Sequence, residues 1–167
     1  GTWIRESVLH PDWQAEFADL TVFGQLRVDP YYRTTADRHP ELGQHFAALT
    51  DECLQRRFSL VHGDFSPKNL LISSTGMMVI DWEVVHWGDP SFDAAFLTNH
   101  LLLKAFHRPN DWRRYRQAAS TFWQALLAGG QPHWLQPAAM RHLGCLLLAR
   151  IDGKAPPGGR FMDVRSA

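Results

Sequence analysis

The sequence lacks an excess of charge of either sign, because 17 lysine and arginine residues balance 17 aspartate and glutamate residues. A protein that binds nucleic acid by broad electrostatic attraction usually carries a basic excess, so the composition argues against a nucleic-acid partner. The chain also lacks an apolar run of about 18 residues, the length that a transmembrane helix needs. Its first ten residues, GTWIRESVLH, are not a basic segment followed by an apolar one. We therefore expect a cytoplasmic protein with no membrane partner.

Cysteine is scarce in this chain. Cys53 and Cys145 are the only two, they lie far apart, and they match no C-x-x-C spacing. This pattern argues against both a disulfide scaffold and a structural zinc module, and it favours a reducing compartment. His100 and His107 could share a helix face, but no third ligand is evident nearby. A zinc site at those two residues is therefore a poor alternative.

The amino-acid composition is that of an ordinary globular protein. Hydrophobic residues make up 45% of the 167 residues, which suits one domain with a packed core. Residues 155–159 read APPGG, and two prolines and two glycines cannot continue a helix. We expect one domain over residues 1–154 and a flexible tail over residues 155–167.

The N-terminal third of the sequence predicts helices with one long interruption. Apolar residues recur at helical spacing between Glu41 and Arg57, and Pro40 stands where the first turn would begin. Between Thr21 and Thr35 the pattern is irregular, and Gly24 and Pro30 indicate turns there.

The last third of the sequence also predicts helices. Phe92–Phe106 is apolar on almost every side, which is typical of a helix in the middle of a core. Asp111–Ala128 predicts a second helix, capped by Asn110 or Asp111 and ending before two glycines. Leu135–Ile151 predicts a third helix that ends at Gly153.

Short apolar runs in the centre of the chain predict strands. Phe58–His62 is the first, Asn69–Ser73 the second and Met77–Asp81 the third. The turn residues Ser74, Thr75 and Gly76 separate the last two runs, as in a β-hairpin. The expected fold class is therefore mainly α with a small central β-hairpin, an α+β architecture.

Three polar residues flank these runs. Asp64 and Asn69 border the loop before the hairpin, and Asp81 closes its second strand. Asn69 and Asp81 then lie at the same end of the hairpin. A carboxylate and an amide oxygen suit Mg²⁺, which takes oxygen ligands and usually keeps substrate phosphates in its shell. Asp64 is close enough in sequence to orient a nucleophilic hydroxyl beside that metal.

This central segment resembles the catalytic centre of kinases. Residues 62–69 read HGDFSPKN, with the Asp-to-Asn spacing of the protein-kinase loop H-R-D-x-x-x-x-N. HGD in place of HRD resembles the aminoglycoside phosphotransferase and choline kinase family, which phosphorylates small molecules. Residues 80–83 (IDWE) and 88–96 (GDPSFDAAF) are also similar to that family. The match spans residues 60 to about 104, and its motifs are ordered and correctly spaced.

The resemblance implies a role for each matching residue. Asp64 would be the catalytic aspartate that accepts or orients the proton of the substrate hydroxyl. Asn69 and Asp81 would hold Mg²⁺ on the phosphates of ATP. The co-substrates implied are a nucleotide and a small hydroxyl-bearing molecule, such as an amino sugar or an amino alcohol.

Four further residues receive supporting roles. The resemblance implies that His62 and Asp93 brace the catalytic loop through hydrogen bonds. Glu83 could assist the metal through a water molecule. Lys68 could contact a phosphate, although a solvated loop lysine is an equal alternative.

Simpler interpretations of these residues exist. Asp64, Asn69 and Asp81 are residue types that often cap turns, so any one of them alone would favour a structural role. The combination at this spacing favours the catalytic interpretation. A group of arginines before and within the second C-terminal helix is most simply a solvated helix face, with anion binding as the alternative. These are Arg108, Arg113, Arg114 and Arg116.

The family fold has two lobes with ATP between them, and the resemblance covers only the helical C-terminal lobe. The residues before His62 predict helices, and the first lysine of the chain is Lys68, so no strand lysine of an N-lobe is present. The N-lobe is expected to be absent, with the chain a fragment, the product of a truncated gene, or dependent on a partner chain. An exposed apolar surface is expected where that lobe would dock.

Three functions follow as hypotheses. The first is an ATP-dependent, Mg²⁺-assisted small-molecule kinase, with the activity of this chain alone left open. The alternative is a non-catalytic kinase-like binding module or remnant. A third, weaker hypothesis is metal-assisted hydrolysis that uses Asp64, Asp81 and His62.

Overall fold

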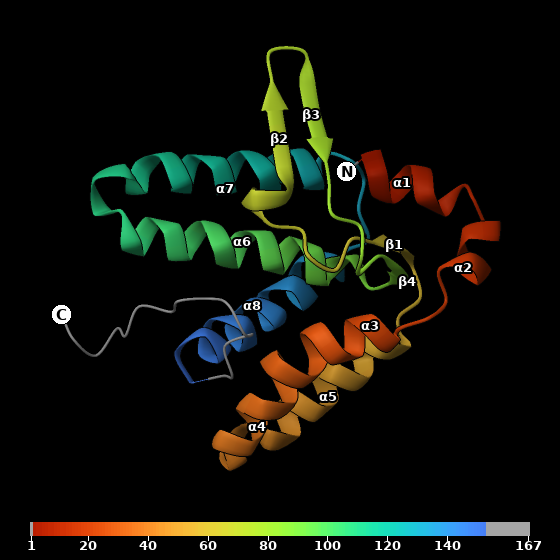
Figure 1. The fold of residues 1–167 in the computed structure, drawn as a ribbon, viewed down its shortest axis with the longest axis vertical. Coiled ribbons are helices and arrows are strands. Elements are labelled where there is room, and N and C mark those ends of the chain that lie inside the picture. Colours follow the sequence, from red (N-terminus) through yellow and green to blue (C-terminus); the bar gives the residue numbers. More distant parts are fainter. Residues whose placement is uncertain (1, 153–167) are drawn as a thin grey trace.

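The structure, a computed structural model, describes residues 2–152 and is mainly helical (Figure 1). The helices are α1 (Thr2–Val8), α2 (Asp12–Glu16), α3 (Thr21–Phe23), α4 (Thr34–Arg38), α5 (Gly43–Gln55), α6 (Pro90–His107), α7 (Trp112–Leu127) and α8 (Leu135–Asp152). The strands are β1 (Ser59–Val61), β2 (Leu70–Ser73), β3 (Gly76–Val79) and β4 (His86–Gly88). The predicted α+β class is confirmed. The predicted tail, residues 155–167, and the helix end predicted at Gly153 lie outside the described residues.

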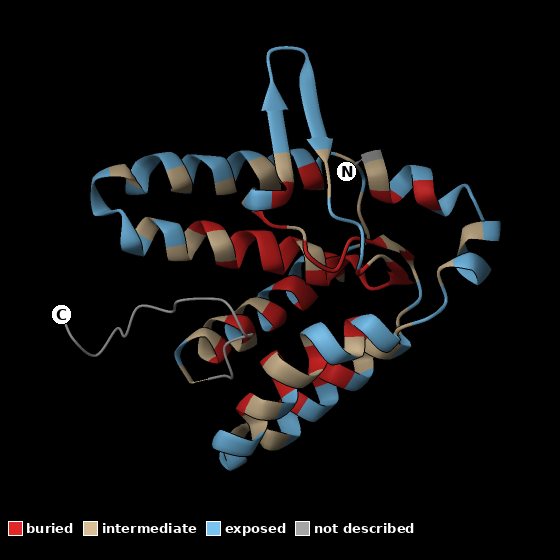
Figure 2. Ribbon diagram, viewed as in Figure 1, coloured by how far each residue is buried: buried red, intermediate tan, exposed pale blue. Residues whose placement is uncertain are grey.

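Helix α6 forms the centre of the core. It lies antiparallel beside α7, and α8 crosses it on the other side (Figure 1). Phe92 and Phe96 are fully buried on its N-terminal half, where their rings stack with centroids 5.4 Å apart. The prediction of a helix apolar and buried on every side is correct only for this half, since Phe106 near its C-terminal end is 77% exposed. Figure 2 shows the same division along the helix.

The segment between Thr21 and Thr35 is helical, so the prediction of turns at Gly24 and Pro30 was wrong. Residues Gly24–Arg33 form a π-helix between α3 and α4, with Pro30 inside it. Proline removes one backbone N–H and would crowd the carbonyl four residues earlier, which here is that of Leu26. The wider π turn fits these constraints, and the guanidinium of Arg27 donates to the Leu26 carbonyl at 2.9 Å.

The predicted hairpin is confirmed and projects from the helical body (Figure 1). Strands β2 and β3 pair antiparallel from Leu70 opposite Val79 to Ser73 opposite Gly76. A second antiparallel pair, β1 with β4, was not predicted. Strand β4 is only three residues long and contains a glycine, so its sequence carries no alternating pattern that could have revealed it.

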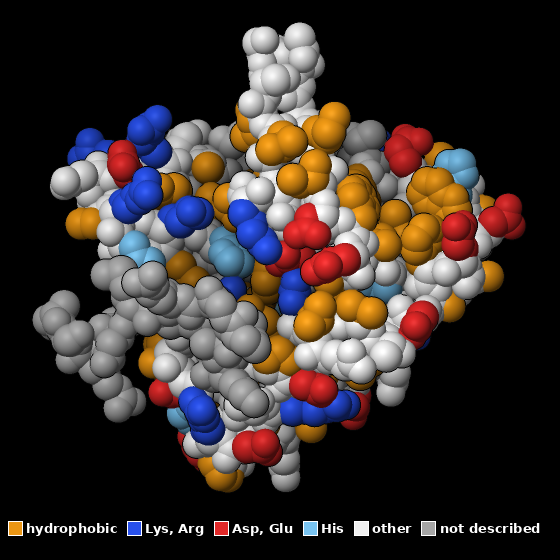
Figure 3. Space-filling view, viewed as in Figure 1, with side chains coloured by type: hydrophobic (Ala, Val, Ile, Leu, Met, Phe, Trp, Pro, Cys, Tyr) orange, Lys and Arg blue, Asp and Glu red, His pale blue; other side chains and the backbone are white. Residues whose placement is uncertain are grey.

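The hairpin exposes large apolar side chains. Leu71, Ile72, Met77 and Met78 are all exposed, as the pale strands in Figure 2 show. In the space-filling view, hydrophobic side chains gather at the base of the projection (Figure 3). Contiguous exposed apolar surface is uncommon on soluble proteins and marks places where another surface or a ligand can bind.

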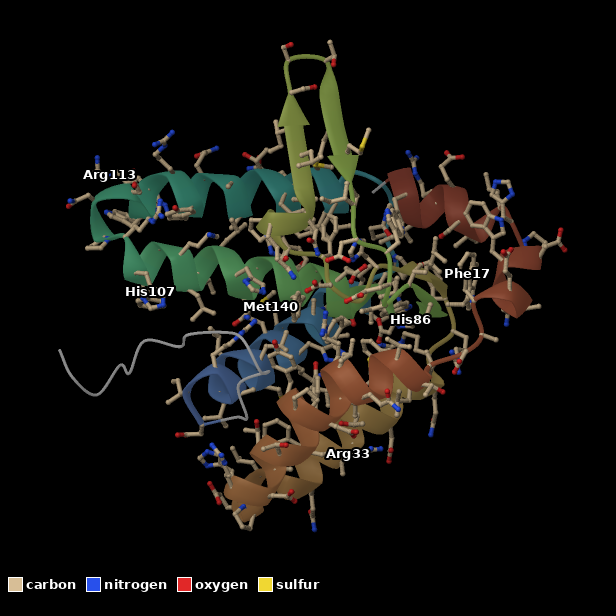
Figure 4. All side chains as sticks on the ribbon, viewed as in Figure 1. Phe17, Arg33, His86, His107, Arg113 and Met140 are labelled. Atoms are coloured by element: carbon tan, nitrogen blue, oxygen red, sulfur yellow. The ribbon has the colours of Figure 1, made fainter. Side chains whose placement is uncertain are left out.

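The outer end of the α6–α7 pair is polar and solvated. All four arginines of the predicted solvated face are exposed, which confirms that interpretation. Asp111 occupies the N-cap position of α7, but its side chain makes no capping hydrogen bond and pairs with Arg114 at 3.6 Å. His107 lies at this outer end (Figure 4), and no cluster of metal-ligand type within residues 2–152 includes it or His100.

The described part of the chain contains no helix that combines the length and the apolarity needed to cross a membrane.

A substitution at Phe92 tests whether the core is centred on the first half of α6. The substitution Phe92→Ala should lower the free energy of unfolding by about 3–5 kcal/mol, because it empties a fully buried site. The matched control on the same helix is Phe106→Ala, which should change it by less than about 0.5 kcal/mol. Urea unfolding followed by circular dichroism measures both, and similar losses for the two variants would contradict a core centred on the first half of α6.

Candidate active site

The second residue of the loop between β1 and β2 is a glycine that no other residue can replace without strain. Gly63 has φ +75°, and a Cβ atom built on it would lie 2.7 Å from both Cγ1 and the carbonyl oxygen of Val84. The chain therefore needs glycine both for the backbone conformation and for the close approach of the segment before β4. This tight turn fixes the direction in which the next residue, Asp64, leaves the loop.

Asp93, in the first turn of α6, fixes the same loop through two hydrogen bonds. Its Oδ2 accepts a hydrogen bond from the backbone N–H of His62 at 2.7 Å, and its Oδ1 accepts one from that of Gly63 at 2.9 Å. Burial raises the pKa of the Asp93 carboxyl to about 6, although these two N–H groups act in the opposite direction. One side chain of the central helix thus fixes two consecutive peptide groups of the loop.

His62 connects the loop to the end of the hairpin. Its side chain is fully buried, and its Nε2 donates to the carbonyl of Ile80 at 3.0 Å. Its Nδ1 accepts from the backbone N–H of Asp64 at 3.1 Å. The acceptor at one ring nitrogen and the donor at the other define a single neutral tautomer. His62, in the loop, and Asp93, on α6, therefore fix the loop through hydrogen bonds.

Asp64 is buried, with 6% of its surface exposed, and its carboxylate contacts three other side chains. Oδ2 accepts from the Asn69 amide at 3.0 Å and pairs with Nζ of Lys68 at 2.9 Å. Oδ1 pairs with Arg27 at 3.1 Å. The Asn69 amide nitrogen also donates to the Asp64 backbone carbonyl at 2.9 Å. These two acceptors orient the Asn69 side chain so that its Oδ1 faces away from Asp64.

Arg27 is a site residue that sequence reasoning missed. It reaches the loop from the π-helix, where its Nε donates to the Gly63 carbonyl at 2.6 Å and its guanidinium lies over the Phe96 ring. No motif contains it, and the segment around it was predicted to be irregular. The local sequence offers only an arginine three residues before Pro30, and such a pattern is too weak to indicate a site.

Asp81 lies at the same end of the hairpin as Asn69, as predicted. The backbone N–H of Ile80, its neighbour, donates to the Asn69 carbonyl at 3.0 Å. Asp81 has φ 68°, an uncommon conformation for a residue with a side chain, and strain of this kind clusters at functional sites. Its exposed carboxylate forms no hydrogen bond or ion pair with any residue in the range 2–152, and Glu83 is likewise exposed.

Between these acidic residues, Trp82 anchors the segment. Its ring stacks on Trp3 of α1 with centroids 4.4 Å apart and lies 4.9 Å from the His62 ring. On the face in Figure 3, acidic and basic side chains adjoin below the hairpin, with hydrophobic side chains around them. The arrangement provides buried and exposed carboxylates, an amide oxygen and two cations within one loop region.

An apolar cavity near the loop is separate from this cluster. Its volume is about 450 Å³, and α1, the base of the hairpin, α6 and α7 line it mainly with apolar side chains. Asp93 is the one titratable residue in its wall, whereas Asp64, Asn69 and Asp81 do not line it. Within the polar cluster, Lys68 and Asp81 are exposed, whereas Asp64 and Asn69 are buried.

Comparison with known proteins gives one result. The model of the phosphotransferase enzyme family (APH) matches residues 9–139. The match covers most of the chain and includes every site residue described above. A search of curated proteins found no match.

Arg27 and Arg33 provide a matched pair, since both lie on the π-helix but only Arg27 reaches the loop. Arg33 forms an exposed pair with Asp29 and lies away from the loop (Figure 4). Arg27→Ala should lower the free energy of unfolding by about 1.5–3 kcal/mol, because it removes charged hydrogen bonds to buried partners. Arg33→Ala should change it by less than about 0.5 kcal/mol. Chemical denaturation checks this, and equal losses would contradict the role assigned to Arg27.

Proposed function

Because the chain belongs to the phosphotransferase enzyme family, we propose that it transfers the terminal phosphoryl group of ATP to a hydroxyl group of a small molecule. The family implies phosphotransferase activity in general, and the nucleotide, the metal and the residue roles below are our proposal. The observation that carries it is the arrangement of Asp64. That carboxylate is buried in a loop which a glycine, a histidine and a helix carboxylate hold in place.

Asp64 is the proposed catalytic aspartate. In the reaction, the acceptor oxygen forms a bond to phosphorus, the bond between phosphorus and the bridging oxygen breaks, and ADP leaves. The proton of the acceptor hydroxyl passes to a carboxylate oxygen of Asp64. Such a step requires positioning more than covalent chemistry, and the fixed backbone of residues 62–64 supplies it.

Asn69 and Asp81 are the proposed ligands of Mg²⁺. The donor set fits this ion, because a free carboxylate and an amide oxygen that faces away from Asp64 are both hard oxygen ligands. When bound, Mg²⁺ supplies positive charge that neutralises the phosphates. Glu83, exposed two residues after Asp81, is proposed to assist through a water molecule.

Lys68 and Arg27 are the cations beside Asp64. Lys68 is 65% exposed, and Asp64 keeps its ion pair with Arg27 when Lys68 moves away, so Lys68 can leave Asp64 and reach a phosphate. Arg27 is largely buried and also bonded to the loop backbone, so it stays in place. We propose that Lys68 contacts the nucleotide and that Arg27, like His62 and Asp93, is a positioning residue.

We further propose that the domain predicted over residues 1–154 is the C-terminal lobe of a kinase-like fold. The described residues contain neither a glycine-rich hairpin nor a strand lysine before the loop, which are the parts that cover the phosphates of ATP in that fold. A further segment or a partner chain would supply them. The exposed apolar hairpin surface is the proposed contact for such a lobe.

Three aspartate variants separate the proposed roles. Asp64→Asn should lower phosphoryl transfer to a panel of amino sugars and amino alcohols by about 10²–10⁴-fold, because the proton acceptor is lost. It should still bind Mg²⁺–ATP. Asp81→Asn should weaken Mg²⁺-dependent ATP binding at least about tenfold, because it removes a charged ligand. Asp51→Asn on α5, an exposed control, should change neither quantity. Isothermal calorimetry and a coupled ADP assay measure these effects.

The same measurements distinguish the alternatives. If the unsubstituted chain is folded and binds Mg²⁺–ATP but phosphorylates no acceptor of the panel, the result would favour the non-catalytic binding module. Phosphate-ester hydrolysis without ATP would favour metal-assisted hydrolysis instead. A folded chain that binds no nucleotide, alone or after addition of an N-lobe, would contradict the proposal.

A further inference from the structure

A second cluster of potential metal ligands lies in the core, outside the proposed active site. It joins Cys53 of α5, Asp89 immediately before α6, and His142 of α8. One ligand atom from each of these residues lies within 4.8 Å of the other two. All three residues are buried, with 7%, 1% and 1% of their surfaces exposed. The sequence argued against a structural zinc module because its two cysteines match no C-x-x-C spacing, and it gave no sign of this cluster, whose members lie 36 or more positions apart and meet only in the fold.

His142 provides an independent sign of a ligand. Its Nε2 atom is buried and has no hydrogen-bond partner among the described residues. Its other ring nitrogen, Nδ1, lies 2.6 Å from the hydroxyl oxygen of Tyr32. A buried polar atom without a partner is rare in native proteins, because it loses its bond to water and gains nothing in return. A metal ion at Nε2 would provide that partner.

Two hydrogen bonds fix the Asp89 carboxylate and leave lone pairs on its oxygens available to a metal. Oδ2 accepts from Arg56 at 2.6 Å, and Oδ1 accepts from the backbone N–H of Ser91 at 2.9 Å. Each carboxylate oxygen has two lone pairs, so one remains on each for a metal. Arg56 also pairs with Glu52. The charge of Arg56 therefore stays compensated when the Asp89 carboxylate shares its negative charge with a cation.

We propose that Cys53 Sγ, an Asp89 carboxylate oxygen and His142 Nε2 bind a zinc ion. One sulfur, one nitrogen and one oxygen form a donor set that zinc accepts, whereas Mg²⁺ prefers oxygen alone. On binding, the Cys53 thiol releases its proton to solvent, and a zinc–sulfur bond forms. The thiolate and the carboxylate then neutralise the two positive charges of the ion, as a buried site requires.

The surrounding contacts match those of a zinc-bound histidine. In known sites, the histidine usually donates its second ring N–H to an oxygen, which fixes the ring. Here Nδ1 donates to the Tyr32 hydroxyl oxygen once Nε2 binds zinc. The ion would tie α5 and α8 to the start of α6, one turn before Asp93. It would therefore stabilise the base on which the loop of Asp64 is built.

The two cysteines make the experiment specific. Cys53→Ser and Cys53→Ala remove the proposed sulfur ligand, whereas Cys145→Ser removes the other free cysteine, which is not in the cluster. Each purified chain is incubated with Zn²⁺, dialysed against metal-free buffer and analysed by mass spectrometry for metal. The parent chain and Cys145→Ser should retain about one zinc per chain. Both Cys53 variants should retain at least about tenfold less.

Cobalt provides a second readout that depends on the sulfur itself. Co²⁺ in place of Zn²⁺ should give a thiolate-to-cobalt charge-transfer band in the near ultraviolet with the parent chain and with Cys145→Ser. The band should be absent from both Cys53 variants. Circular dichroism shows that each variant is folded, and the parent chain should also melt at a higher temperature with zinc than after chelation.

Two results would overturn the proposal. The first is a folded parent chain that retains no zinc and shows no cobalt–thiolate band. The second is retention of zinc and of the band in the Cys53 variants at the level of Cys145→Ser. Neither result bears on nucleotide binding, so the zinc site and the proposed phosphotransferase activity stand or fall separately.

Discussion

The two hydrogen bonds that the Asp93 carboxylate accepts from the backbone N–H groups of His62 and Gly63 are the constraint on which the polar cluster depends. They join the central helix to a loop whose first part, residues 62–66, belongs to no helix or strand. Because the loop backbone is held at two consecutive peptides, Asp64 can be buried with its carboxylate at a defined position. His62 extends the same connection to Ile80 at the end of the hairpin, one residue before Asp81. Helix, loop and hairpin therefore position their polar groups as one unit.

The π-helix shows how a locally unfavourable sequence can serve a distant site. Pro30 cannot take part in a regular α-helix without losing a bond, and the wider turn places Arg27 where it satisfies the Leu26 carbonyl and reaches the loop. The same guanidinium compensates the buried charge of Asp64 and packs over Phe96. A buried carboxylate is costly unless it is paired, so this segment makes the burial of Asp64 possible.

The start of α6 connects the two clusters in this protein. Asp89 lies just before the helix, in contact with Arg56 and close to Cys53 and His142, and Asp93 lies one turn later beneath the loop. A group that fixes Asp89 therefore also fixes the base of the loop. The proposed phosphoryl transfer requires positioning and charge more than covalent chemistry, so a rigid base would bear directly on it.

The sequence by itself determined the features that local patterns encode. The helices α5 to α8, the hairpin and the spacing from His62 to Asn69 follow from periodicity, turn residues and short-range order, and the same patterns pointed to the correct family. Tertiary structure decided the features that depend on residues far apart in the chain. These are the approach of Arg27 to Asp64, the pairing of β1 with β4, and the meeting of Cys53, Asp89 and His142. No local pattern records such contacts, because they arise only when the helices pack around α6.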